Sequence, residues 1–173
     1  PLVIHFSGCM PDPVQSGGVL WPVQSIVPHL KSENEGFPIA LSCSKSAHKA
    51  MTNFAKLIAS EVYELSETER QTAHLTAVFA ANFTNHCFAL AQELCERAGL
   101  PWDLFRPIAR KIVDQAVQGT SKQHQTGPAV RQDQSALDAH LKLLVNHPEF
   151  KPVYTALSSS IESLHHASEN PKL

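Results

Sequence analysis

The sequence predicts two structural parts, an α/β sheet followed by an all-helical domain. Three observations favour this fold: short apolar runs separated by turn residues up to residue 66, a long stretch without proline or glycine up to residue 98, and helical periodicity beyond it. We expect the sheet part to occupy residues 1–66, the helical domain residues 67–166 and a frayed polar tail residues 167–173.

Composition narrows the functional classes. Of 173 residues, 43% are hydrophobic, and 14 basic against 16 acidic side chains give a net charge of -2. A nucleic-acid binder or a protein of the membrane surface needs a concentrated positive field, so this balance argues against both. No apolar run approaches the ~20 residues that a membrane-spanning helix needs. We therefore expect a soluble globular protein with neither nucleic acid nor membrane as a partner.

In the sheet part, apolar runs predict four strands, at residues 2–6, 19–23, 39–43 and 62–65. Pro22 makes the second strand an edge strand or marks its end. Helical spacing over residues 46–60, between the third and fourth strands, predicts a parallel crossover unit.

In the helical domain, the sequence predicts one long helix and three shorter ones. Ser66 provides an N-cap, Gly99 a stop, and the helix between them carries apolar residues nearly all round, which is typical of a central, buried helix. The other predicted helices span residues 102–118, 132–146 and 148–164.

The four cysteines form no CxxC pair, which argues against a zinc ribbon or a thioredoxin-type site. Cys87 and Cys95 lie ~12 Å apart on one predicted helix, too far for a disulfide. Unpaired thiols favour a reducing cytoplasm. Histidines on the same helix are too far apart to share a metal ion, so no metal site is predicted.

His74 is the first candidate functional residue. Ala73 and Ala77 leave room beside it, and at ~100° per residue Asn85 returns to within ~20° of its direction, while Asn82 is displaced by ~80°. A histidine and two amides on one helix could orient a carbonyl substrate, with the imidazole as proton donor. The alternative is a core histidine bonded to a backbone carbonyl.

The connection at residues 119–131 is the second candidate. About 13 residues is long for a helical bundle, and long ordered loops are often functional. Gly127 allows unusual backbone geometry and Arg131 precedes a helix N-terminus. The alternative is a flexible surface loop in which Arg131 pairs with Asp133.

Four segments in order carry a resemblance to a known family: HFSG at 5–8, PVQS at 22–25, HLTAVFAANF at 74–83 and TGPAVRQD at 126–133. The chain resembles NAD(P)-dependent oxidoreductases that join an N-terminal Rossmann domain to a C-terminal helical domain of unknown function. These are distant kin of NADP-dependent deazaflavin reductases, pyrroline-5-carboxylate reductases and 6-phosphogluconate-type dehydrogenases. The resemblance implies a remnant of a Rossmann-like sheet followed by a helical domain for dimerisation or substrate binding.

The resemblance also implies site residues, a cofactor and a partner. His74 and Asn82 would be catalytic; the cofactor, NADP or NAD, would be bound by Ser7, Gly8, Gln24 and Ser25; the substrate would be bound by Asn85, Thr126, Gly127 and Arg131. The partner would be a second copy, with the long helix at the interface of a homodimer.

One motif of the family does not occur in this sequence. The family begins with a strand, a GxGxxG turn and a helix that bind the pyrophosphate, whereas the seven glycines here form no such motif. We expect the chain to correspond to the family without that first half. A non-catalytic helical dimerisation or interaction module is therefore the alternative to an oxidoreductase. A hydrolase is disfavoured because no GxSxG elbow occurs.

Overall fold

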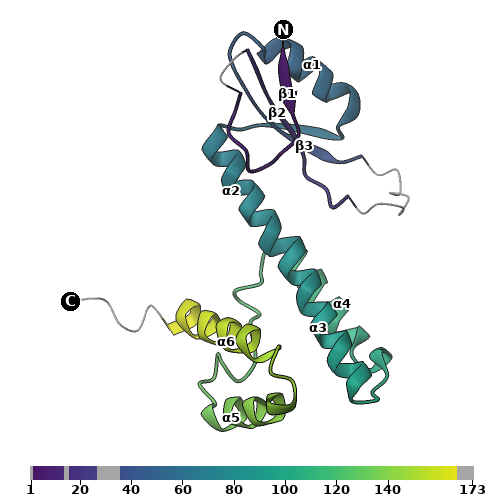
Figure 1. The fold of residues 1–173 in the computed structure, drawn as a ribbon, viewed down its shortest axis with the longest axis vertical. Coiled ribbons are helices and arrows are strands. Elements are labelled where there is room, and N and C mark those ends of the chain that lie inside the picture. Colours follow the sequence, from purple (N-terminus) through teal and green to yellow (C-terminus); the bar gives the residue numbers. More distant parts are fainter. Residues whose placement is uncertain (1, 14–15, 27–35, 167–173) are drawn as a thin grey trace, which may run out of the picture. The chain divides into compact units, whose positions relative to one another are not determined.

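The structure, a computed structural model, describes residues 2–13, 16–26 and 36–166. The chain forms two compact units, Pro1–Ala89 and Leu90–Leu173 (Figure 1). The predicted frayed tail at residues 167–173 lies outside the described residues. No described helix is long and apolar enough to cross a membrane.

The first unit contains a four-stranded mixed sheet (Figure 1). Its strands, in spatial order, are β1 (Val3–His5), β2 (Gly17–Pro22), β3 (Pro38–Cys43) and β4 (Glu61–Glu64). The pairs β1–β2 and β3–β4 are parallel, and β2–β3 is antiparallel. Helix α1 (His48–Ile58) connects the parallel strands β3 and β4, which confirms the predicted crossover unit.

The second predicted strand is not at an edge of the sheet. β2 lies between β1 and β3, and Pro22 is its last residue, so the proline marks the end of the strand. Pro22 has no N–H to donate, and the next residue, Val23, donates its own to the carbonyl of Pro38 at 2.9 Å.

Helices cover both faces of this sheet. On one face Leu20, Ile39 and Leu41 pack against Ala47, Met51 and Ala55, of which the last two lie on α1. On the other face Val19, Trp21 and Ala40 pack against Ala73 and Ala77 of α2 (Glu67–Ala77). Since successive strand residues point to opposite faces, the buried runs in β2 and β3 supply both cores.

Helix α2 begins with a reciprocal capping box. The backbone N–H of Glu69 donates to Ser66 Oγ at 3.2 Å, and that of Ser66 donates to Glu69 Oε2 at 2.8 Å. The Ser66 hydroxyl also donates to the same carboxylate, and this bond holds the pKa of Glu69 below its usual value. The stabilisation from that carboxylate is present above the ordinary pKa of glutamate and is lost as the pH falls through the lowered one.

Replacing Ser66 by alanine should lower the free energy of unfolding of the first unit by about 1 kcal/mol. The variant loses both hydrogen bonds of the Ser66 hydroxyl, the one from the Glu69 N–H and the one to the Glu69 carboxylate. Urea unfolding followed by Trp21 emission, in a Trp102→Phe background, measures the change. Thr68→Ala, on the same exposed turn, is the matched control and should cost less. An equal loss in the two variants would contradict a specific capping role.

The helix at residues 67–98 is present, but the prediction that it is buried at the centre of a bundle is wrong for the single chain. It continues from α2 through the π-helical segment η1 (Val78–Phe83) into α3 (Thr84–Arg97). Over these elements only Arg70 and Cys95 are buried, whereas Phe79 is 61% and Phe83 50% exposed. Apolar residues all round a helix predict burial, and one chain does not supply it here.

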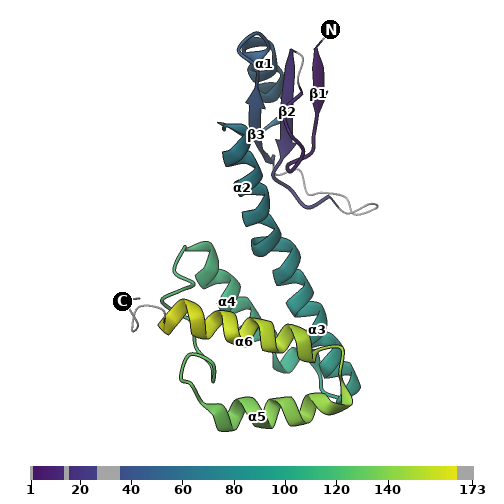
Figure 2. The same ribbon diagram turned by 60° about the vertical axis from the view of Figure 1, so that its left-hand side comes forward.

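The second unit is helical. Besides the end of α3 it contains η2 (Trp102–Leu104), α4 (Arg106–Val117), α5 (Gln134–Leu143), η3 (Leu144–Asn146) and α6 (Lys151–His166) (Figure 2). Asp133 caps α5 by accepting from the backbone N–H of Ala136 at 3.1 Å. Arg97 donates to Glu149 at 2.6 Å and lies 5.0 Å from the centre of the Phe150 ring. These contacts attach α3 to the turn before α6.

Candidate functional site

An open pocket of about 630 Å³ lies in the first unit, between the segment that ends β2 and the helix opposite it. The β2 side provides Trp21, Val23, Gln24, Ser25 and Ile26. The helix side provides Ala73, His74, Thr76, Ala77, Val78, Ala80, Ala81 and Asn82. Among the described residues that line it there is no lysine, arginine or carboxylate, and His74 is the one titratable side chain of that set.

His74 lies in this pocket next to an aromatic ring and a glycine. Its imidazole centre is 5.2 Å from the Trp21 ring, at an interplanar angle of 57°. A Cβ built on Gly8 would lie 2.9 Å from His74 Cγ and 2.9 Å from Trp21 Cδ2, closer than real Cβ contacts. The absence of a side chain at Gly8 therefore lets the loop after β1 pack directly on the imidazole.

The segment η1 changes which asparagine shares the direction of His74. A π turn holds about one residue more than an α turn, so Asn82 takes the register of position 81 and comes to within ~20° of His74. Asn85 is shifted away by the same insertion. Accordingly Asn82 lines the pocket, and Asn85 is exposed and is not among the lining residues. Thr84 Oγ1 donates to the Phe79 carbonyl, five residues back, at 3.0 Å.

The residues predicted to bind a cofactor occupy two places. Gln24 and Ser25 line the pocket, as does His74. Gly8 touches the ring of His74, and Ser7 lies beside it in the loop, where its hydroxyl accepts from the backbone N–H of Met10 at 3.4 Å. The structure thus brings Gln24, Ser25, His74 and Asn82 to one pocket, and Gly8 lies next to the His74 ring.

The predicted residues Thr126, Gly127 and Arg131 belong to the second unit. Gly127 has a φ of 113°, the conformation that its lack of a side chain permits, and Arg131 is exposed. Asp133, the alternative partner of Arg131, caps α5. Within its own unit this segment contacts α6, because Nε2 of His166 lies 3.0 Å from the carbonyl oxygen of Val130.

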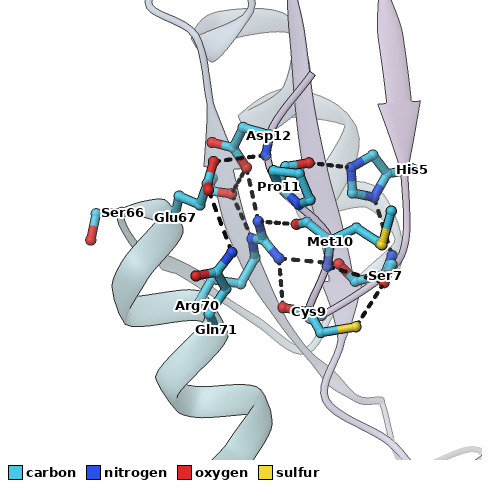
Figure 3. A network of polar contacts seen from close by, with 12 residues as sticks. His5, Ser7, Cys9, Met10, Pro11, Asp12, Ser66, Glu67, Arg70 and Gln71 are labelled. Atoms are coloured by element: carbon cyan, nitrogen blue, oxygen red, sulfur yellow. Dashed lines mark hydrogen bonds and ion pairs between the residues drawn. The ribbon is translucent and has the colours of Figure 1, made fainter. Parts of the chain in front are cut away.

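Arg70, which was not among the predicted site residues, is fully buried, and its guanidinium forms a network of polar contacts (Figure 3). Its side chain donates to Ser42 Oγ at 2.7 Å and to Asp12 Oδ1 at 3.0 Å. It also donates to the carbonyl oxygens of Ser7, Gly8 and Met10 at 3.1, 2.6 and 2.7 Å. One sequence signal existed: acidic side chains favour the first turn of a helix, and an arginine there opposes the helix dipole.

Cys43 at the end of β3 is not a lining residue of the pocket and packs against the core on the α1 face of the sheet. Burial raises its pKa most, and the nearby carboxylates of Glu64 and Asp12 raise it further. A thiol with a raised pKa is a poor nucleophile at neutral pH. Among the described residues, no group of three or more histidine, cysteine or carboxylate side chains could hold a metal ion.

Replacing Gly8 by alanine should lower the free energy of unfolding of the first unit by roughly 1–3 kcal/mol, because the added methyl group overlaps the rings of His74 and Trp21. In a His74→Ala background the same change should cost less, since one of the two rings is gone. A double-mutant cycle on urea unfolding measures this coupling. Equal costs in both backgrounds would show that Gly8 and His74 are not in contact.

Three comparisons relate the chain to known proteins. The family model described as "Domain of unknown function (DUF2520)" matches residues 37–161. Among curated proteins, none matches the chain. Solved structures that are similar to it include the following two. The first is described as "putative NADP oxidoreductase BF3122" from Bacteroides fragilis, with 30% identity and a TM-score of 0.81 over 93% of this chain. The second is protein TM1727 from Thermotoga maritima, with 16% identity and a TM-score of 0.72 over 97%.

These similarities establish the fold. The chain has a Rossmann-like α/β part followed by helices, as the sequence predicted, and it resembles NAD(P)-dependent oxidoreductases in structure. It spans 64% of the length of the Bacteroides fragilis protein and 70% of that of the Thermotoga maritima protein. The matched family region begins before β3 and ends within α6, so it includes His74 and Asn82.

Proposed function

Because the chain belongs to the DUF2520 family, we propose that it contributes part of the sheet and the helical domain to an NAD(P)-dependent oxidoreductase. The substrate is a small carbonyl, imine or hydroxy compound. The observation that carries the proposal is the pocket in which His74 lies with amide and hydroxyl groups, and among its described lining residues His74 is the one titratable side chain. The similar Bacteroides fragilis structure supports the oxidoreductase class and favours NADP over NAD.

In this proposal His74 is the catalytic acid and base. Reduction of a carbonyl or imine requires a proton at the oxygen or nitrogen, and oxidation of a hydroxy compound requires its removal. An imidazole titrates near neutral pH and can do either. No hydrogen bond to a described residue occupies the ring nitrogens of His74, so they are available to a ligand. This favours the catalytic interpretation over a core histidine bonded to backbone.

Asn82, Gln24 and Ser25 would orient the reactants. Asn82 lies on the helix side of the pocket, whereas Gln24 and Ser25 lie at the end of β2 on the opposite side. Each amide offers both donors and an acceptor, and the hydroxyl offers one of each. These groups suit a neutral polar substituent such as a carboxamide or carbonyl, held against the apolar surface of Trp21 and the alanines.

The amide and hydroxyl groups of the pocket fit the nicotinamide end of a dinucleotide better than they fit its phosphates. A bound nicotinamide supplies or accepts the hydride. Its ring and carboxamide match an apolar pocket with amide partners, and Gly8, Gln24 and Ser25 would hold it. The described residues of the lining include no lysine or arginine, and we expect the pyrophosphate to be bound away from them. Asn85, Thr126, Gly127 and Arg131 remain candidates for substrate binding.

Trp21 provides the test, because its ring lines the pocket. In the full-length protein with Trp102→Phe, addition of NADPH should quench Trp21 emission in a saturable manner. The Trp21→Phe variant, which retains Trp102, is the control and should show no saturable quenching. If NADPH leaves Trp21 emission unchanged, the oxidoreductase proposal fails and the interaction module becomes the better account.

We also propose that the protein is a homodimer. Leu75, Phe79 and Phe83 are each at least half exposed in the single chain, and the two phenylalanine rings stack edge to face with centres 5.1 Å apart. Exposed apolar clusters on a helix are typical of interaction sites. A second copy of the chain would cover this cluster.

Replacing Phe83 by glutamate should convert the homodimer into a monomer, because a carboxylate would be buried in an apolar interface. Light scattering at micromolar concentration should give twice the chain mass for the native protein and one chain mass for the variant. Phe54→Glu, at a residue of α1 that is 45% exposed, is the control and should remain dimeric. A native protein that is monomeric at these concentrations would contradict the proposal.

A further inference from the structure

The loop at residues 7–12, between β1 and β2, is tied to helix α2 by one side chain. The Arg70 guanidinium donates to three backbone carbonyls of this loop and to the carboxylate of Asp12 (Figure 3). Residues 60 or so positions apart in the sequence are joined in this way. The fifth contact of the guanidinium is from Nε to Ser42 Oγ, so each of its three nitrogens has a partner. The other four contacts are to the 7–12 loop.

Asp12 neutralises the buried charge and is itself held in place. Its Oδ1 accepts from Arg70 at 3.0 Å and from the Ser42 hydroxyl at 2.6 Å. Its backbone N–H donates to Glu67 Oε2 at 2.8 Å. The Arg70 side chain is 0% exposed and that of Asp12 26% exposed. Burying an arginine costs several kcal/mol unless its contacts are complete, so this arrangement strongly specifies one loop conformation.

The same loop forms one wall against His74. Arg70 and His74 are four residues apart on α2, so they lie on the same face in consecutive turns. Arg70 holds the carbonyl of Gly8 at 2.6 Å, and the backbone of that glycine packs against the imidazole of His74. The ring of Trp21 confines the imidazole further. Few rotamers are open to a ring held between a fixed backbone and an indole.

We propose that Arg70, together with Asp12, is a positioning residue for His74: it fixes the 7–12 loop so that Gly8 holds the imidazole in one orientation at the pocket. The catalytic meaning of that orientation rests on the proposed function. The orientation itself does not, and it can be measured in the free protein. A group that transfers a proton must be held within a few tenths of an ångström of its productive position.

A lysine at position 70 tests the proposal, because it keeps the charge but cannot reproduce the planar set of donors that spans the carbonyls and the carboxylate. In Arg70→Lys, nuclear Overhauser effects from the His74 ring protons to Trp21 and Gly8 should fall below half their native intensity. Effects between paired strands, such as Val19 with Ser42, should persist. Glu69→Gln, an exposed residue of the same helix, is the control and should leave the His74 effects unchanged.

Asp12→Asn provides the second variant in case Arg70→Lys does not fold. It keeps the size of the side chain and removes its charge. The nuclear Overhauser effects from the His74 ring to Trp21 and Gly8 should weaken, to a smaller degree than in Arg70→Lys. Native intensities at His74 in a folded variant that has only lost thermal stability would overturn the proposal and leave Arg70 as a structural anchor. Titration with NADP+ separates the two claims: if the native protein does not bind it, the proposed function fails while the His74 measurement still decides the positioning role.

Discussion

Replacing His74 by glutamine should lower the turnover of the full-length enzyme by about 10²–10⁴-fold. Glutamine keeps a polar side chain of similar reach at the pocket but does not titrate, so it can orient a substrate without transferring a proton. The measurement is the rate of NADPH oxidation with small carbonyl and imine compounds. The loss should appear mainly in kcat, because the orienting groups Gln24, Ser25 and Asn82 remain.

His86→Gln is the matched control for this experiment. His86 is exposed on α3 and is not a lining residue of the pocket, so its replacement should leave turnover unchanged. Native turnover in His74→Gln would exclude the imidazole as the acid and base. The pocket would then be a binding surface in which His74 contributes only its ring.

Replacing Arg70 by leucine should lower the free energy of unfolding of the first unit by roughly 3–5 kcal/mol. The change leaves the Asp12 carboxylate without its cation and removes the donors from three loop carbonyls. This is a large fraction of the stability of a small domain, so part of the protein should unfold at ambient temperature. Urea unfolding followed by Trp21 emission in the Trp102→Phe background measures the change.

Arg110→Leu is the control for that loss. Arg110 is an exposed residue of α4 in the second unit, so its replacement should change the stability of the first unit by less than about 0.5 kcal/mol. A similarly small effect for Arg70→Leu would mean that the guanidinium contacts contribute little beyond what they cost to bury.

The sheet could be predicted from the sequence because its strands are short apolar runs. Residues 39–43 and 62–65, with helical spacing between them, indicated a parallel crossover, and the structure has it. The position of β2 within the sheet was less predictable. A proline at a strand end and a proline in an edge strand look the same in sequence, and only the pairing of β2 with both β1 and β3 distinguishes them.

The burial of the long helix could not be predicted, because periodicity reports how much apolar surface a helix has and not which chain covers it. Phe79 and Phe83 are of a residue type that is usually buried in a core, and both are exposed in the single chain. The register of the asparagines failed for a local reason. The π-helical segment over residues 78–83 has no clear sequence signal. It places Asn82, instead of Asn85, on the side of the helix that carries His74.

The site was only partly visible in the sequence. His74 was identified from its neighbours on the helix and Gln24 and Ser25 through a resemblance, and the structure places all three around one pocket. Arg70 was missed because its partners Ser7, Gly8, Met10 and Asp12 are about 60 residues away along the chain. A surface arginine in a helix is the usual case, and the one local signal, its place in the first turn of α2, does not show that this arginine is buried.

In the proposed function, the pocket around His74 holds the reacting end of a nicotinamide dinucleotide. The most direct measurement is of nuclear Overhauser effects between the nicotinamide protons of bound NADPH and the ring protons of His74 and Trp21 in the full-length protein. We expect nuclear Overhauser effects from the nicotinamide protons to both residues, and no such effects from the adenine protons of the same molecule to either residue. Bound NADPH whose nicotinamide protons contact neither His74 nor Trp21 would contradict it.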